Sequence, residues 1–144
     1  MATTVSNATL KVVIEEDIIL SGSQRGSRTE LSIADIDEYS RRVMTALTSA
    51  TRIVAFDSAV STGTYIDSNV KYIRITNLDS EYYVTLHLDA GSEDSYVKLP
   101  AGYSYILGAG ASVLGTDSSL VNLDLIFATA NTAPVDLEVV VASG

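Results

Sequence analysis

Apolar residues recur at every second position along several short segments of this chain, and this alternation is what most restricts its fold. In the segment 135–142 (VDLEVVVA), every odd position is apolar, whereas Asp136 and Glu138 occupy even positions. The segment 121–127 (VNLDLIF) repeats the pattern. Successive side chains of a strand point to opposite faces, so the spacing predicts strands that bury one face.

Further strand-like segments follow at short intervals and are separated by turn-forming residues. Besides the two segments above, strands are expected at Thr9–Leu20, Ser27–Ile33, Arg52–Phe56, Val70–Asn77, Glu81–Leu88, Tyr96–Leu99 and Tyr103–Leu107. The intervening turns are Ser21–Gly26, Asn77–Ser80, Asp89–Asp94, Pro100–Gly102, Gly108–Ser119 and Asn131–Pro134. Short strands divided by frequent turns are typical of sandwiches and barrels. We therefore predict an all-β, antiparallel β-sandwich of about eight or nine strands.

The N-terminal part of the chain has its own pattern. Three consecutive acids, Glu15–Asp17, interrupt the strand-like segment Thr9–Leu20, which predicts a bulge or a break there. Ser27–Ile33 is expected to return as its hairpin partner. Residues 1–8 are expected to form an N-terminal arm that can reach a neighbouring subunit. No linker or shift in composition divides residues 1–144, so one domain is expected.

The segment Ser32–Leu47 (SIADIDEYSRRVMTAL) fits two structures. Apolar residues recur every three or four positions from Ile36 onward, as in a helix, and Ser32 is a suitable N-cap. From Tyr39 onward the residues also alternate as a strand would. Because a β-rich context can override local propensity, we favour a strand from Tyr39, with Ile33–Glu38 as a turn or short helix.

Charge and cysteine content exclude several classes of function. The chain has 18 acidic and 9 basic residues, a formal net charge of −9. Such a charge repels phosphates and anionic lipids, so neither nucleic acid nor membrane is expected as a partner. The absence of cysteine excludes disulfides and thiolate chemistry, and fits assembly in a reducing cytoplasm. No targeting segment is expected in the polar residues 1–7.

Few residues offer catalytic or metal-binding chemistry, so we expect no enzyme activity, no cofactor and no metal. His87 is the only histidine and shares its expected strand face with Tyr83 and Thr85, which favours exposure to solvent or a subunit contact. The segment Asp89–Asp94 (DAGSED) is rich in oxygen ligands for calcium, but it lacks the spaced acids of an EF-hand loop and is expected to be a solvated turn. The other acidic clusters are Glu15–Asp17 and Asp35–Glu38.

Two further enzyme signals are weak. A small hydrolase with paired carboxylates is the enzyme alternative, but the chain has no tryptophan to serve as a substrate platform. The glycines of Gly108–Gly110 lack the strand–loop–helix context of a phosphate site, and Lys98 carries no motif.

Tyrosine is the most frequent aromatic residue of this chain, with eight copies. They include Tyr65, Tyr72, Tyr82, Tyr83, Tyr96, Tyr103 and Tyr105. Tyrosine has a large contact area and a polar tip, so it suits cross-strand packing, subunit interfaces and stacking on sugars. All three uses stay open.

The strand sequences resemble those of a known group of proteins. Val70–Leu78 (VKYIRITNL) runs into Tyr82–Leu88 (YYVTLHL), and Val97–Leu107 (VKLPAGYSYIL) leads to the closing Ala133–Ser143 (APVDLEVVVAS). This series is similar to the small, acidic, cysteine-free β proteins in the virions of tailed bacteriophages, above all capsid decoration or cement proteins. The resemblance covers about residues 56–143.

This resemblance implies a jelly-roll-like sandwich, with an immunoglobulin-like sandwich as the alternative. It also implies many copies per particle, a dimer or trimer, and no enzyme activity. The expected function is a cement subunit on the outer capsid surface that bridges the major capsid protein or other virion proteins. The alternative is a tail, collar or head-fibre module that binds host carbohydrate. Its candidate stacking residues are Tyr72, Tyr82, Tyr83 and Tyr103.

Overall fold

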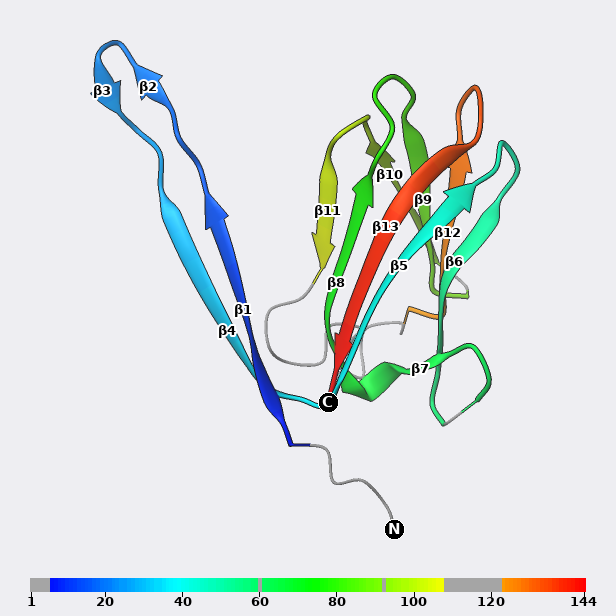
Figure 1. Ribbon diagram of the computed structural model, residues 1–144. Helices are drawn as coiled ribbons and strands as arrows, with labels where there is room; N and C mark the ends of the chain where they lie inside the picture. The colour runs from blue at the N-terminus through cyan, green and yellow to red at the C-terminus, as the bar shows by residue number, and fades with distance from the viewer. Residues whose placement is uncertain (1–5, 60, 92, 108–122) are drawn as a thin grey trace.

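Strands form nearly all of the regular secondary structure in a computed structural model that describes residues 6–59, 61–91, 93–107 and 123–144. Two sheets pack face to face, and a long hairpin leaves them at one end (Figure 1). The described residues contain no α-helix and one 3-10 turn, η1 (Asp67–Asn69). Residues 1–5 of the expected N-terminal arm and the whole turn expected at Gly108–Ser119, which includes Gly108–Gly110, lie outside the described residues.

The two sheets of the sandwich are antiparallel except for one short pairing. The first sheet has the order β10 (Asp94–Leu99), β9 (Val84–Asp89), β12 (Leu125–Ala130), β6 (Thr51–Asp57) and β7 (Tyr65–Ile66). The second sheet has the order β11 (Ser104–Leu107), β8 (Val70–Asn77), β13 (Val135–Ser143) and β5 (Glu38–Ala46). Only β6 and β7 run parallel among the described strands.

The connectivity of the sandwich is that of a jelly roll. We number the sandwich strands from β5 to β13 in chain order as 1 to 8, omitting the two-residue β7. The sheets then have the orders 6-3-8-1 and 5-4-7-2. Consecutive strands therefore mostly alternate between sheets, as in jelly rolls. An immunoglobulin sandwich would instead pair its first two strands in one sheet. The all-β, jelly-roll-like prediction is confirmed.

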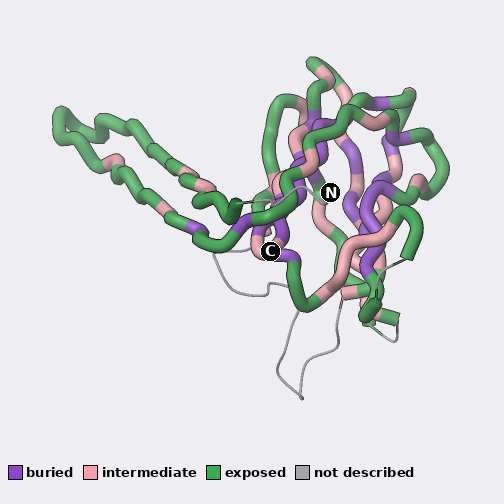
Figure 2. Tube along the Cα trace, turned by 60° about the horizontal axis from the view of Figure 1, so that its bottom comes forward, coloured by how far each residue is buried: buried purple, intermediate pink, exposed green. Residues whose placement is uncertain are grey.

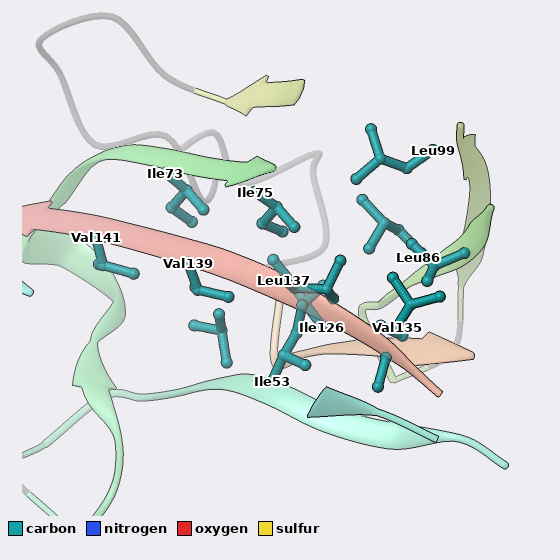
Figure 3. Packing of buried hydrophobic residues seen from close by; sticks show 14 of the residues in the cluster. Ile53, Ile73, Ile75, Leu86, Leu99, Ile126, Val135, Leu137, Val139 and Val141 are labelled. Carbon is teal, nitrogen blue, oxygen red and sulfur yellow. The ribbon is translucent and has the colours of Figure 1, made fainter. Parts of the chain in front are cut away.

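The core lies between the two sheets and is made of aliphatic side chains (Figure 3). The central strand β13 contributes residues at odd positions, among them Leu137, which has 0% of its surface exposed. These residues lie beside Ile73 and Ile75 of the neighbouring strand β8, and the same core cluster includes Ile126 of β12 in the opposite sheet. The predicted alternation is thus the physical basis of this layer, because burying apolar area is the main favourable contribution to folding.

The segment 32–46 is strand throughout, apart from a single residue. β4 (Arg28–Ile36) and β5 are separated only by Asp37. The strand expected from Tyr39 is confirmed, whereas the turn or short helix expected at Ile33–Glu38 is wrong. The first acid of this segment, Asp35, lies instead at a shift in the register between β1 and β4, and its φ is 57°. A bulge of this kind adds residues to one strand and bends it.

A buried asparagine joins two of the motifs that carry the family resemblance. Asn77 has 0% of its surface exposed, and its Nδ2 donates to the carbonyl oxygens of Tyr82 (3.0 Å) and Leu99 (3.1 Å). Its Oδ1 accepts from the Asp79 N–H at 2.9 Å, and its main-chain oxygen accepts from Gly102. The turn after β8 and the Leu-Pro-Ala-Gly turn are therefore held together by one amide.

We expect Asn77→Ala to lower the free energy of unfolding by about 2–4 kcal/mol, because it leaves buried carbonyl and N–H groups without partners. Urea denaturation monitored by circular dichroism measures this change. Asn131→Ala is the matched control, since Asn131 is exposed and, among the described residues, its side-chain amide bonds only to the adjacent Thr132. Equal losses in the two variants would contradict the assigned role of Asn77.

Candidate functional site: a projecting hairpin arm

The hairpin that leaves the sandwich, residues 8–36, is called here the arm. β1 (Ala8–Glu15) pairs antiparallel with β4, from Leu10 opposite Ile33 to Glu15 opposite Arg28. Short strands β2 (Ile19–Leu20) and β3 (Ser23–Gln24) continue it to the tip. The arm diverges from the sandwich as it rises from its base (Figure 1). The hairpin predicted across Ser21–Gly26 is confirmed.

The local sequence explains how the arm turns and where its strands break. Ser21 and Gly22 have φ angles of 53° and 79°, the positive values of a two-residue type I′ hairpin turn. The break at the three acids is bridged by Gln24, whose Oε1 accepts from Gly26 N–H at 2.8 Å and whose Nε2 donates to Asp17 at 2.6 Å. A side chain at Gly26 would collide with the Glu16 carbonyl oxygen. The predicted interruption is thus confirmed.

The base of the arm is anchored on the outer face of the sheet that contains β13. Ile33 and Ile36 are 1% and 5% exposed and pack in a small cluster with Tyr72, Val140 and Ala142. Burial raises the pKa of the Tyr72 phenol. Lys71 Nζ donates to the carbonyl oxygens of Ala34 and Asp35, both at 3.1 Å. This second, smaller core fixes the angle at which the arm departs.

Beyond this anchor most of the described residues of the arm are exposed (Figure 2). Its exposed apolar side chains are Val13 (43%), Ile14 (39%), Ile18 (51%), Ile19 (71%) and Leu20 (58%). An isolated two-stranded hairpin is only marginally stable in water, and clustered exposed apolar residues mark interaction surfaces. The arm therefore has the composition of a segment that packs against another molecule.

Charged side chains cover the face of the arm that carries Lys11 and Val13. Lys11 Nζ lies 2.5 Å from Glu30, which Arg28 also contacts at 3.1 Å. These two cations, Lys11 first, lower the pKa of the Glu30 carboxyl. Glu15 has only a long contact of 3.8 Å to Arg28, and its side chain is 65% exposed. Exposed pairs of this kind add little to stability, so these charges are available for recognition.

A groove of about 300 Å³ lies between the arm and the sandwich. Its walls are Leu10, Lys11, Val12 and Val13 of β1 on one side, and Tyr39, Tyr72, Arg74, Ile106 and Val140 of the sheet on the other. Beside it, Glu138 binds Arg41 at 2.8 Å and Arg74 at 2.7 Å. The hydrogen bonds from Arg41 and then Arg74 lower the pKa of the Glu138 carboxyl. The groove is thus lined by both apolar and polar side chains, with these charged groups at its border.

The structure brings the predicted histidine and one acidic segment together at the end of β9. His87 Nε2 is 2.8 Å from Asp94 Oδ1, and the imidazole stacks on Tyr96 with ring centroids 4.6 Å apart. It also stacks on Phe127 at 5.6 Å. The side chain of His87 is 24% exposed. The ring is therefore fixed between two aromatic side chains.

His87, Asp89 and Asp94 form the one group of three such donors among the described residues that could share a metal ion, with ligand atoms within 4.8 Å of one another. Imidazole and carboxylate are ligands of zinc and of similar ions. The loop itself is closed by its own bonds, because Asp89 Oδ1 accepts from Gly91 N–H at 2.8 Å. The acids thus act at least as turn formers and as the partner of His87.

The tyrosines named as sugar candidates do not gather on one surface. Tyr72 is buried beneath the arm, and Tyr82 packs against the main core. Tyr83 lies under Lys98, whose Nζ is 4.2 Å from the ring centroid. Tyr103 is 65% exposed in a turn. The four tyrosine side chains therefore differ in their burial and in their contacts.

Comparison with known proteins identifies no relative. No family model, no curated protein and no solved structure matches the chain. Among the described residues, no helix is long and apolar enough to cross a membrane.

Proposed function

We propose that this protein is a structural subunit of a virus particle, a capsid decoration or cement protein that bridges neighbouring shell subunits from the outer surface. The observation that carries the proposal is the arm, a hairpin whose distal apolar side chains are exposed among the residues that the structure describes. The jelly roll supports it, because this architecture is frequent in viral capsid domains. Jelly rolls also occur in lectins, but the scattered tyrosines do not favour a sugar-binding role.

The proposed mechanism is that binding of this subunit stabilises the assembled shell. A subunit whose sandwich rests on one shell protein and whose arm tip rests on the next must be removed before the shell can come apart. Anything that binds only the assembled state stabilises it by mass action. The three apolar residues at the tip, Ile18, Ile19 and Leu20, supply the buried area for this contact. The net charge of −9 favours solubility at high copy number.

The test adds purified protein to capsids that lack it and measures the capsid melting temperature. The wild-type protein is expected to raise it by several degrees. A variant with Ile18→Ser, Ile19→Ser and Leu20→Ser is expected to lose most of this increase, because the tip then has no apolar surface to bury. Leu78→Ser is the control, since Leu78 is 48% exposed on the sandwich. If the wild-type protein leaves the capsid melting temperature unchanged, the proposal is wrong.

A further inference from the structure

We propose that β1 pairs antiparallel with β1 of a second copy, about a two-fold axis at Val13, so that two arms form one four-stranded sheet. The inference rests on the proposed function, because it concerns the same arm. It assigns a second copy of this chain as the partner of the β1 edge. The contact uses the edge of β1, which is separate from the apolar tip.

The outer edge of β1 has unpaired main-chain groups. Among the described strands, β1 pairs only with β4. Glu16 N–H donates to the Ser27 carbonyl oxygen at 2.8 Å across the hairpin. Main-chain groups alternate between the two sides of an antiparallel strand. The N–H and C=O groups of Lys11, Val13 and Glu15 therefore point away from β4, towards the open edge.

This edge is less protected than the other edge of the arm. Exposed edge strands usually avoid pairing through charge, proline, bulges or a covering segment. The central part of β1, Lys11–Glu15 (KVVIE), has three β-branched apolar residues and no proline. β4 carries Arg28, Glu30 and Asp35, with a register shift near its end. β1 is thus the edge at which a further strand can be added.

The sequence of β1 is complementary to itself in one register. With Val13 opposite Val13 of the second copy, Lys11 lies opposite Glu15 in both halves of the pair. On the other face, Val12 lies opposite Ile14. Opposite charges and β-branched pairs directly across a ladder are favourable, and two-fold contacts are self-complementary by nature.

The neighbouring registers lack this match. The open edge allows only shifts that keep odd residues opposite odd residues, because their main-chain groups must face each other. Centring the pair on Val12 sets Lys11 opposite Val13, and centring it on Ile14 sets Glu15 opposite Val13. Only the axis at Val13 pairs every charge in Lys11–Glu15 with its opposite.

The charges required for this pairing are exposed. The side chains of Lys11 and Glu15 are 61% and 65% exposed. An added strand lies beside Lys11 and Val13, where β1 borders the groove of about 300 Å³. Sandwich residues such as Ile106, which is 38% exposed, form the opposite wall. The second strand would therefore cover apolar surface on both walls.

The first experiment measures dimerisation of the full chain by sedimentation over a range of protein concentrations. The wild type is expected to dimerise reversibly. Lys11→Glu and Glu15→Lys are each expected to raise the dimer dissociation constant about tenfold or more, because each places two like-charged pairs across the axis. The double charge swap, Lys11→Glu with Glu15→Lys, is expected to restore the affinity at least in part.

The double swap separates this contact from effects inside one chain. The double variant loses both ion pairs within one chain, that of Lys11 with Glu30 and that of Glu15 with Arg28. Any dimer affinity that it regains therefore comes from the contact between the two copies. If the double variant dimerises no more tightly than the worse of the two single variants, the proposed register is wrong. A wild type that stays monomeric at all concentrations would overturn the dimer. Loss of capsid stabilisation by the tip variant would in that case leave the proposed function standing.

A second measurement does not depend on the charges. The chain has no cysteine, so Val13→Cys introduces a single thiol at the axis. Directly paired residues of an antiparallel ladder have Cα atoms about 4.5–5.5 Å apart, within disulfide reach. Under mild oxidation this variant is expected to form a covalent dimer much faster than Val43→Cys, whose site is 65% exposed on β5. Equal rates would contradict the proposed axis.

Discussion

Leu137→Ala is expected to cost about 3–4 kcal/mol of the free energy of unfolding, the largest loss we predict for a single truncation in this protein. Leu137 is fully buried at 0% exposure on β13, which lies between β8 and β5. Its removal leaves a cavity between the two sheets, which close packing prevents from collapsing. A domain of this size should melt about 10 °C lower.

The measurement is calorimetry together with urea denaturation, and Leu20→Ala is the matched control. Leu20 is 58% exposed at the tip of the arm, so its truncation is expected to change the free energy by less than about 0.5 kcal/mol. A small effect at Leu137 would mean that the sandwich interior is not packed around β13. A large effect at Leu20 would mean that the tip is already covered.

Alternation in the sequence predicted most of the strands because it reflects a local rule. β13 and β8 appear at the positions expected from their period of two, and the break at Glu15–Asp17 lies where the pattern fails. Local rules were insufficient at Ile33–Glu38, where acids that suit a helix start instead occupy a bulge next to β5. There the pairing of β5 with the central strand β13 decides the conformation.

The projection of the arm could not be predicted from the same rule. Val13 and Ile14 look like Val139 and Val141 in sequence, yet the first two are exposed and the last two are buried. What separates them is whether a second sheet covers them. That depends on contacts distant in the chain, which alternation within one strand does not encode.

The charged contacts beside the groove were missed for a related reason. Glu138 binds Arg41 and Arg74 from positions 97 and 64 residues away. In the sequence, each of these three residues has only the pattern of a charged residue on the outer face of a strand. Only the register of β5, β13 and β8 places the three side by side. The convergence of His87 and Asp94 likewise needed the pairing of β9 with β10.

Ile33→Asp is expected to release the arm while the sandwich stays folded. Ile33 is 1% exposed in the small cluster that anchors the arm, and a carboxylate there would be surrounded by Tyr72, Val140 and other apolar groups. Without this anchor the hairpin is a two-stranded ribbon, which is marginal in water. Its amides should then exchange with solvent at least a hundredfold faster, whereas those of β13 stay protected.

Hydrogen exchange followed by mass spectrometry measures both segments in one sample. Ala34→Asp is the control, because it places the same side chain on an exposed neighbouring position of β4. If Ile33→Asp instead exposes the arm and β13 together, the arm and the sandwich form one cooperative unit. If it exposes neither, the small cluster is not the anchor. Independent release of the arm is the result expected of a segment whose remaining stability comes from another molecule.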